Sequence, residues 1–410
     1  MKLRTYKEVE SFLFKQLPMF QRIGPKAFKK DLKNIKFLDA VLGHPHKAFK
    51  AIHIAGTNGK GSTSFFIASV LAAQGYKVGL YTSPHYRTYR ERIRVNGAMI
   101  PKKKVTRFVN LLMDLKVFES SLKPSFFEIS VAMAFNHFKD EKVDFAVIET
   151  GLGGRLDSTN IITPILSVIT NIGFDHTEFL GNTLKKIARE KAGIIKKNVP
   201  VIIGKRQAEC EGVFTSIASK KKATISWADD DPVKWSSKFK KANPAYLLEN
   251  ANTAFHVLNQ ILSRISQRKM EEVWLKQLPH WGFYGRFQWL SSEPKVLADS
   301  AHNYEGLQIL FNQLENIDFD SLHIVLGVVK DKDLEKVLPL FPKEARYYFV
   351  QAMVPRALDR QTLKKQSSKY GLNGRSYSSV RRGLYFAKQK SSNGDLILVT
   401  GSIFTVAEVV

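Results

Sequence analysis

The sequence has little cysteine and no long apolar run. Its 410 residues include one cysteine, Cys210, which excludes an internal disulfide framework and a metal site built from several cysteines. The apolar stretch from Phe65 to Ala73 is closed by Gln74 and Gly75, so it falls well short of the about 20 residues that span a bilayer. The N-terminal residues mix charges and lack the apolar centre of a signal peptide. We therefore expect a cytoplasmic protein with no membrane partner.

Acidic residues are scarce relative to basic ones. The chain has 37 aspartates and glutamates against 63 lysines and arginines, which gives a formal net charge of +26. Such an excess can mark a nucleic-acid-binding protein, because basic side chains release counterions from phosphates. Here the basic residues are scattered in short groups, without a basic tail or a recognisable nucleic-acid module. We expect no nucleic-acid partner and keep a basic RNA-associated protein as an alternative for an assay to separate.

The chain is long enough for two domains, and short β-branched runs alternate with helical stretches along it. This alternation is typical of mainly parallel sheets covered by helices. The predicted strands are 51–55, 78–81, 145–149, 166–170 and 201–203, followed by 296–298, 323–326, 347–350 and 396–399. We expect an α/β protein with a large N-terminal domain at 1–285 and a smaller C-terminal α/β domain at 290–410, joined near Gly282 to Trp289.

A glycine-dense loop tipped by a lysine follows the first predicted strand, at Gly56 to Ser62. Glycines let backbone N–H groups turn towards phosphate oxygens, and Lys60 places a cation on the outer phosphates. Ser62 offers a hydroxyl to a divalent metal at the start of the helix that follows. The spacing departs from an ordinary Walker A loop, because Ile54 stands at the first glycine place and Gly61 separates the lysine from the serine. A plain strand-to-helix turn would explain the glycines but neither Lys60 nor the hydroxyl.

Polar side chains also follow three other predicted strands. Ser83 comes after the second strand, Glu149 ends the third, and His176 lies beyond the fourth. The carboxyl ends of parallel strands meet at one edge of a sheet, where ligands bind. A carboxylate facing a phosphate loop is placed to hold Mg²⁺ directly or through water. A lone histidine at a strand end is more often structural, but sharing this edge with Lys60 and Glu149 favours metal binding.

Taken together and in order, these motifs resemble the folylpolyglutamate synthase and dihydrofolate synthase family, part of the Mur ligase superfamily of ATP-dependent amide-bond-forming enzymes. The resemblance covers nearly the whole chain and implies a Mur-ligase-like fold, with an N-terminal P-loop-type domain and a Rossmann-like C-terminal domain. The motifs are Gly56 to Ser62, Thr82 to His85, Gly151 to Asn160, Asp175-His176, Glu190 to Ile194, Asp299 to Asn303 and Asp331 to Asp333.

The resemblance also implies roles for individual residues. ATP would contact a set drawn from both domains, namely Asn58, Gly59, Lys60, Gly61, Ser62, Asn250, Arg286 and Asp299. Magnesium, with two ions expected, would be held by Ser83, Glu149, His176 and Lys191, the last as a carbamate. Carbamylation has a physical logic, because CO₂ converts the Lys191 cation into an anion able to hold a metal. Lys60, Lys191 and His302 would be the catalytic residues, with His302 near the transferred phosphate.

The implied reaction activates a carboxylate as an acyl phosphate, which the amine of L-glutamate then attacks. The implied pterin contacts are Ser125, Phe126, Phe127, Glu128, Leu156, Asp157 and Ser158. Aromatic faces beside a carboxylate suit a flat heterocycle, but Phe126 and Phe127 fit equally well as core residues at a helix start. The sequence Arg155-Leu156-Asp157 resembles bacterial enzymes that add the first glutamate to dihydropteroate, and extension of a folate tail is also expected.

Some positions depart from the family pattern. Asn34 stands where many relatives have arginine, and Tyr284 and Tyr304 replace prolines. These departures leave the pterin and adenine contacts open, while the groups needed for phosphate chemistry are all present. A muropeptide-type Mur ligase and a nucleotide-binding ATPase module without ligase activity are the alternatives. For the folate ligase we expect a monomer whose partners are small molecules, namely dihydropteroate or folate and L-glutamate.

Overall fold

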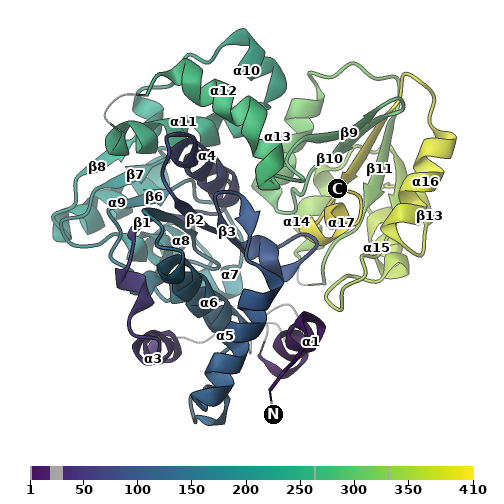
Figure 1. The fold of residues 1–410 in the computed structure, drawn as a ribbon. Coiled ribbons are helices and arrows are strands. Elements are labelled where there is room, and N and C mark those ends of the chain that lie inside the picture. Colours follow the sequence, from purple (N-terminus) through teal and green to yellow (C-terminus); the bar gives the residue numbers. More distant parts are fainter. Residues whose placement is uncertain (1, 19–30, 263–264, 331) are drawn as a thin grey trace. The chain divides into compact units, whose positions relative to one another are not determined.

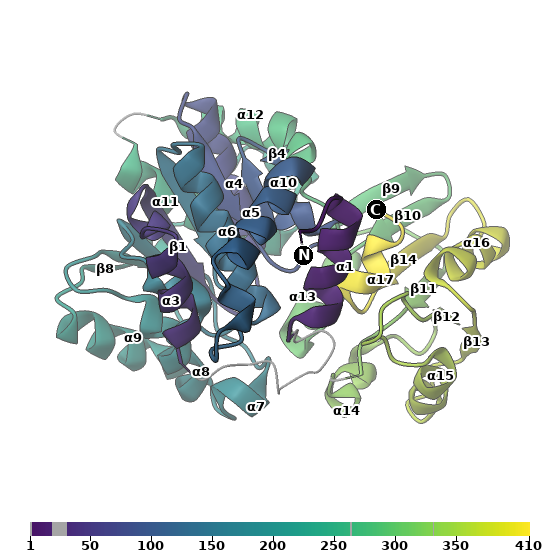
Figure 2. The ribbon, with the colours of Figure 1, turned by 60° about the horizontal axis from the view of Figure 1, so that its bottom comes forward.

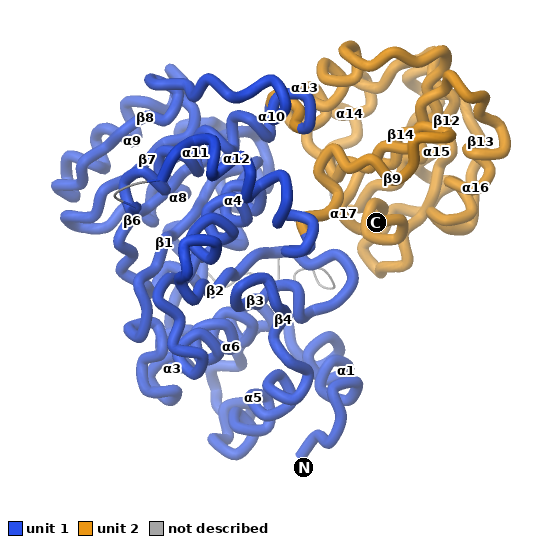
Figure 3. Tube along the Cα trace, turned by 45° about the horizontal axis from the view of Figure 1, so that its top comes forward, with its two compact units in different colours: residues 1–242, 246–282 blue, residues 243–245, 283–410 orange. Residues whose placement is uncertain are grey.

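The structure is a computed structural model that describes residues 2–18, 31–262, 265–330 and 332–410. It forms two compact units (Figure 3). Unit 1 comprises residues 1–242 and 246–282, and unit 2 comprises residues 243–245 and 283–410. The chain passes from unit 1 to unit 2 at Gly282 and Phe283, inside the segment where the sequence predicts a junction.

Unit 1 is built on an eight-stranded sheet with the order β4-β3-β2-β5-β1-β6-β7-β8. The strands are β1 Lys50–Ala55, β2 Val78–Tyr81, β3 Ile93–Val95, β4 Ala98–Met99, β5 Phe145–Glu149, β6 Leu166–Ile169, β7 Val201–Ile203 and β8 Ile225–Trp227. Neighbours from β2 to β8 are parallel, whereas β3 is antiparallel to both β2 and β4. Predicted strands are confirmed at β1, β2, β5, β6 and β7, and the sequence analysis missed β3, β4 and β8.

The register of this sheet aligns the ends of its central strands. Ile54 of β1 lies opposite Glu149 of β5, Ala55 lies opposite Ile169 of β6, and β2 ends with Tyr81 opposite Ile148. The loops after β1, β2, β5 and β6 therefore leave the sheet at the same edge, which is the condition for a shared site.

Helices cover the sheet of unit 1 and bury its apolar side chains. They are α1 Tyr6–Gln16, α3 Lys33–Val41, α4 Lys60–Ala73, α5 Lys102–Asp114, α6 Phe126–Asp140, α7 Thr177–Leu180, α8 Leu184–Lys191, α9 Ala208–Lys220, α10 Ser237–Ala242, α11 Ala245–Ile261 and α12 Gln267–Gln277. Helices α5 and α6 lie side by side in Figures 1 and 2, over a core that includes Phe135 and Ile148. Helix α4 contacts β2 and β5 and packs against α12, where the Trp274 indole N–H donates to the Phe66 carbonyl at 2.9 Å.

Unit 2 has a six-stranded sheet with the order β13-β12-β11-β14-β10-β9, parallel except for β9. Its strands are β9 Gln288–Ser292, β10 Lys295–Ala298, β11 Leu322–Leu326, β12 Arg346–Phe349, β13 Gly374–Ser376 and β14 Leu396–Thr400. Its helices are α13 Tyr304–Leu314, α14 Leu334–Val337, α15 Arg360–Ser368, α16 Val380–Lys390 and α17 Ile403–Ala407. The predicted α/β fold class is confirmed in both units. Within the described residues, no helix has the length and apolarity that crossing a membrane requires.

Candidate active site

The phosphate loop turns from β1 into α4 through a left-handed glycine. Gly59 has φ 83° and caps α4, which begins at Lys60. The first N–H groups of a helix have no partner inside it, so this turn presents them, with their partial positive charge, to an anion. A Cβ at Gly59 would overlap the side-chain amide of Asn250, a buried residue of α11. Asn250 therefore lies against the loop, and its assignment as an ATP contact stays a prediction. Ser62 is buried in the first turn of α4.

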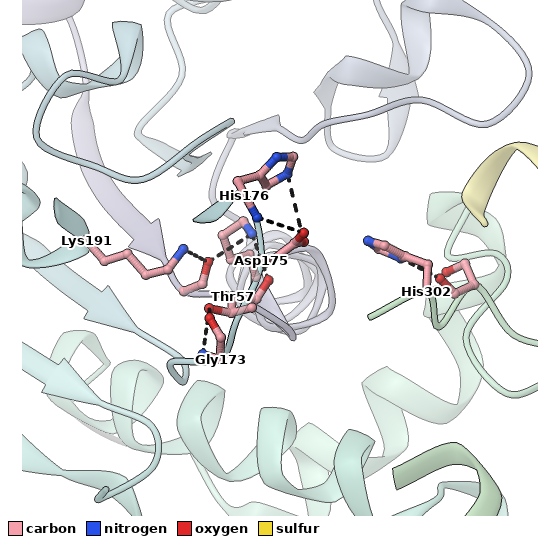
Figure 4. Close-up of polar contacts among 9 residues, drawn as sticks. Thr57, Gly173, Asp175, His176, Lys191 and His302 are labelled. Atoms are coloured by element: carbon pink, nitrogen blue, oxygen red, sulfur yellow. Dashed lines mark hydrogen bonds and ion pairs between the residues drawn. The ribbon is translucent and has the colours of Figure 1, made fainter. Parts of the chain in front are cut away.

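The loop after β6 fastens the phosphate loop in place. Thr57 Oγ1 donates to the Gly173 carbonyl at 3.1 Å and accepts the Gly173 N–H at 2.9 Å (Figure 4). The Asn58 N–H donates to Asn171 Oδ1 at 3.0 Å, and Thr170 Oγ1 donates to the Asn58 carbonyl at 2.6 Å. The sequence analysis assigned no role to Thr57, Thr170 or Asn171. Their position in strand-end loops was the available signal.

Glu149 and Ser83 meet beside the start of α4. The Ser83 N–H donates to Glu149 Oε2 at 2.9 Å, which ties the loop after β2 to the end of β5. A Cβ on Gly61 would lie 3.7 Å from each oxygen of the Glu149 carboxylate, and this glutamate is 4% exposed. A carboxylate and a serine hydroxyl are hard oxygen ligands of the kind that Mg²⁺ takes in phosphate sites, so the donor set at this position fits that ion.

His176 lies on the same loop that fastens the phosphate loop. It adopts a left-handed conformation with φ 51° and begins α7. Its backbone N–H donates to Asp175 Oδ1 at 3.0 Å, and its Nε2 lies 3.8 Å from Asp175 Oδ2. Asp175, which the sequence analysis named only as part of a motif, thereby lies beside the His176 imidazole and adds a carboxylate there (Figure 4).

Two lysines converge on one backbone carbonyl of the phosphate loop. Lys191, at the end of α8 and 4% exposed, donates from Nζ to the Gly56 carbonyl at 2.6 Å (Figure 4). Lys60 Nζ donates to the same carbonyl at 3.0 Å and to the Thr57 carbonyl at 3.1 Å. Burial, aided by the charge of Lys60, holds the pKa of Lys191 well below its usual range, although Asp175 opposes this shift. Burial therefore acts against the charged form of the Lys191 amine.

The glycine loop after β5 is braced by one aspartate. Asp157 Oδ2 accepts the N–H groups of Gly151 at 2.9 Å and Leu152 at 2.8 Å. Its Oδ1 accepts the Thr159 N–H at 3.0 Å and hydroxyl at 2.6 Å. Burial raises the pKa of this carboxyl, and the four hydrogen bonds counter that effect. Asp157 thus shapes the loop from inside, next to the half-buried Leu156.

The remaining predicted pterin residues lie at the start of α6, where three are buried and Phe127 is partly buried. Ser125 and Glu128 form a capping box at the start of α6, in which the Ser125 N–H and hydroxyl donate to Glu128 Oε2 at 2.7 and 2.8 Å. The Asn34 side chain also donates to this oxygen, at 3.1 Å. Phe126 belongs to the buried core. The Phe127 ring is partly buried and lies so close to Gly151 that a Cβ there would overlap it.

In unit 2, three predicted site residues gather where the segment before β9 meets the turn after β10. Asp299 accepts the Phe287 N–H on Oδ2 and the Ala301 N–H on Oδ1, both at 2.8 Å. Arg286 Nη1 donates to the Gly285 carbonyl at 3.1 Å, and His302 Nδ1 donates to the Ser300 carbonyl at 2.9 Å. Arg286, Asp299 and His302 are thus brought together within their own unit. Asp331, from the last motif, lies outside the described residues.

Two Mur ligase domain descriptions match the chain. The Mur ligase middle domain matches residues 54–245, and the Mur ligase glutamate ligase domain matches residues 285–403. The chain is 33% identical to a dihydrofolate synthase/folylpolyglutamate synthase of Bacillus subtilis, over 93% of this chain and 94% of that protein. It is 30% identical to the Escherichia coli protein of the same name, over 96% of this chain and 93% of that protein.

Solved structures agree with these sequence matches. Escherichia coli FolC in complex with DHPP and ADP superimposes with a TM-score of 0.85 at 28% identity, covering 99% of this chain and 97% of that one. A bifunctional folylpolyglutamate synthase/dihydrofolate synthase from Yersinia pestis, complexed with AMPPNP and Mn ion, gives a TM-score of 0.83 at 26% identity, covering 99% and 97%. The likeness therefore extends over both units.

Proposed function

The chain belongs to the dihydrofolate synthase/folylpolyglutamate synthase family of Mur ligases, and we propose that it joins L-glutamate to the carboxylate of dihydropteroate, and also to folates. The observation that carries this proposal is the gathering of groups around the phosphate loop: Lys60 and Lys191 on the Gly56 carbonyl, and Ser83 with Glu149 beside Gly61. A lone ATP-binding turn would not require the second lysine or the buried carboxylate.

The reaction has two steps. A carboxylate oxygen of the pterin substrate attacks the γ-phosphorus of ATP, ADP leaves, and an acyl phosphate forms. The amine of L-glutamate then attacks the acyl carbon, phosphate leaves, and a proton passes to solvent as the amide forms. Lys60 and the first N–H groups of α4 stabilise the charge on the transferred phosphoryl group. We assign Asn250, Arg286 and Asp299 to the rest of ATP, and His302 to the transferred phosphate.

Ser83, Glu149 and His176 would hold magnesium, whose charge stabilises the transferred phosphoryl group. The complexes of relatives with ADP, or with AMPPNP and a Mn ion, support ATP and a divalent metal as requirements here. The hydrogen bond between Ser83 and Glu149 holds both ligands in place before the ion arrives. Asp175 adds a negative charge beside this histidine, with its Oδ2 3.8 Å from His176 Nε2.

We further assign Lys191 as a carbamylated lysine. CO₂ reacts with a neutral amine, and burial favours that form of Lys191. A carbamate nitrogen keeps one N–H, so it still donates to the Gly56 carbonyl as the amine does. The new carboxylate would lie near the Lys60 cation and would supply oxygen ligands for a second magnesium ion.

The pterin ring would lie on the exposed part of Phe127, beside the loop that carries Leu156 and Ser158. Asp157 acts here as a brace for the loop, because its two oxygens already accept four hydrogen bonds. Ser125 and Glu128 likewise hold the start of α6, so we expect them to position Phe127 rather than to bind through free polar atoms.

Product mass spectrometry tests this function. The chain is incubated with ATP, Mg²⁺, L-glutamate and either dihydropteroate or tetrahydrofolate, while phosphate release is followed in parallel. We expect a glutamyl increment on dihydropteroate, a further increment on tetrahydrofolate, and phosphate release that requires both the pterin and glutamate. Constant phosphate release without either substrate would favour a plain ATPase, and release stimulated by RNA would favour an RNA-associated protein. If a muropeptide is supplied as a further substrate and only that substrate gives a product, the result would favour a muropeptide-type Mur ligase.

A further inference from the structure

A group of three side chains with metal-ligating atoms lies at the end of α3 and in the turn that follows it, and none of the three is assigned to the reaction. His44 Nδ1 lies 2.7 Å from Asp39 Oδ2, and His46 Nδ1 lies 2.6 Å from Asp39 Oδ1. One ligand atom from each of the three residues lies within 4.8 Å of the other two. The sequence analysis assigned no role to these residues, which have the spacing Asp-x₄-His-x-His and do not follow a predicted strand.

The backbone of the turn holds the three side chains in this arrangement. Helix α3 ends at Val41, and the His44 N–H donates to the Asp39 carbonyl at 2.8 Å, which closes the turn. His44 is left-handed with φ 53°, and Pro45 starts a short 3₁₀ helix that carries His46. Both imidazoles are thereby directed to the same carboxylate from opposite sides of a proline.

The surroundings of the three residues suit an ion that arrives from solvent. The Asp39 side chain is 6% exposed, and its ion-pair partners among the described residues are the two histidines. The side chains of His44 and His46 are 52% and 17% exposed. A buried carboxylate is therefore covered by two imidazoles, one of which is half exposed to water.

We propose that Asp39, His44 and His46 bind a divalent transition metal of the zinc class through the two Nδ1 atoms and the carboxylate. Imidazole suits Zn²⁺, Cu²⁺ and Ni²⁺, whereas Mg²⁺ and Ca²⁺ take oxygen ligands, so this site differs in chemistry from the one at Glu149. Binding releases any Nδ1 protons to solvent, and water completes the coordination. The proposal is independent of the proposed function.

The required movement is small. Metal bonds of about 2.0–2.1 Å in a tetrahedral site place ligand atoms about 3.3 Å apart, and the present Nδ1 to oxygen distances are 2.6 and 2.7 Å. Each imidazole therefore needs to move away from its carboxylate oxygen by roughly 0.6 Å at these bond lengths. Ligand atoms of the three residues lie within 4.8 Å of one another, so a pair at that separation also needs to approach to about 3.3 Å. The exposure of His44 permits this shift without disturbing the core. The ion would tie the end of α3 to the turn that leads into β1, the strand before the phosphate loop.

Metal titration of the full chain tests the site. The protein is stripped with a chelator and titrated with Co²⁺, whose visible absorption reports four-coordinate binding, and then with Zn²⁺ to displace it, in the presence of excess Mg²⁺. We expect one tightly held ion, and a loss of affinity of at least about 10-fold in His44→Asn and in His46→Asn, as for damage to other protein metal sites. Asparagine keeps an N–H donor for Asp39, and it tolerates the left-handed backbone at position 44.

Control variants separate this site from other histidines. His280→Asn removes an exposed imidazole of unit 1 and should leave the affinity unchanged, as should His176→Asn. Circular dichroism checks that each variant is folded, and Zn²⁺ should raise the Tm of the parent chain but not that of the double variant His44→Asn/His46→Asn. Equal affinity of the parent and the folded double variant, or a loss of affinity with His176→Asn instead, would overturn the proposal.

Discussion

The strand-end loops of unit 1 and the strand-end turn of unit 2 are held together in different ways. In unit 1, Lys191 reaches the Gly56 carbonyl across 135 positions of the chain, and Thr57 bonds Gly173 across 116. In unit 2, Asp299 bonds Phe287 across 12 positions and Ala301 across 2. The first set depends on the whole sheet being folded, whereas the second set joins the two open ends of the β9–β10 hairpin.

This difference separates preorganisation of the phosphate loop in unit 1 from local stability in unit 2. Long-range contacts bring a buried lysine and a buried carboxylate to the phosphate loop before any ligand is present, so unit 1 is preorganised for phosphate chemistry. A local turn can instead be formed by unit 2 alone. Substitutions should therefore affect chemistry most strongly in unit 1 and local stability in unit 2, and the following experiments test that division from the largest expected effect downward.

The largest effect is expected from Lys60→Met. Removing the cation that we assign to the transferred phosphate should lower kcat by about 10²- to 10³-fold, comparable to the loss of one stabilising donor in other enzymes. Lys103→Met, which removes an exposed lysine from α5, is the matched control and should retain full activity. Glutamate-dependent ADP release measures both. An unchanged kcat in Lys60→Met would contradict a role for Lys60 in phosphate transfer.

The next effect concerns the left-handed glycine of the phosphate loop. Gly59→Ala adds backbone strain at φ 83° and pushes against Asn250, so the free energy of unfolding should fall by about 3 kcal/mol. Gly75→Ala is a matched control, because its φ is 92° but nothing lies within 4 Å of the added methyl, and it should cost about 1 kcal/mol. Urea unfolding compares the two. Equal losses would show that Asn250 does not constrain the loop.

A smaller and more local effect is expected from Asp299→Asn in unit 2. The amide would keep one acceptor but turn a donor towards a second backbone N–H, which should cost about 2 kcal/mol. Hydrogen exchange should become faster in β10 and β9 and stay unchanged in β1. Asp318→Asn, at an exposed position, should change neither. Faster exchange in the unit 1 sheet would contradict the local character of this turn.

The smallest effect is a pH dependence at Lys191. Because burial lowers the pKa of this amine in the folded state, the unfolded chain binds more protons between that depressed pKa and the usual lysine range. The free energy of unfolding of the parent should therefore rise with pH relative to Lys191→Met, by up to about 1.4 kcal/mol per pH unit in this window. Lys185→Met, on the exposed side of α8, is the control. Urea unfolding in CO₂-free buffer from pH 7 to 8 measures the slopes, and parallel profiles would contradict the shift.

The sequence predicted the parts of the fold that have strong apolar runs. Residues such as Val78 to Tyr81 and Phe145 to Glu149 are buried on both faces of a parallel sheet, and continuous apolar runs are typical of such strands. The hairpin of β3 and β4 was missed, although Asn96-Gly97 between its strands is a strong turn signal. Its strands are too short for periodicity to reveal them.

For the site, the sequence predicted which loops meet at one edge of the sheet, but not which side chains form hydrogen bonds there. Strand order places Glu149 and Ser83 at one edge, and their hydrogen bond follows from that placement. The spacing of Ser125 and Glu128 is that of a capping box, which indicates a helix start, but the resemblance to the folate ligase family favoured a substrate role for both residues. The convergence of Lys191 on Gly56 depends on the packing of α8, which spacing along the chain does not encode.

A crystal structure with Mn²⁺ and a non-hydrolysable ATP analogue, read by anomalous diffraction, tests the central claim most directly. The account predicts that the terminal phosphates lie against Lys60 and the first turn of α4, with a Mn²⁺ peak bonded to Ser83 Oγ and a Glu149 oxygen. Phosphates bound away from α4, with the peak distant from Glu149, would contradict it.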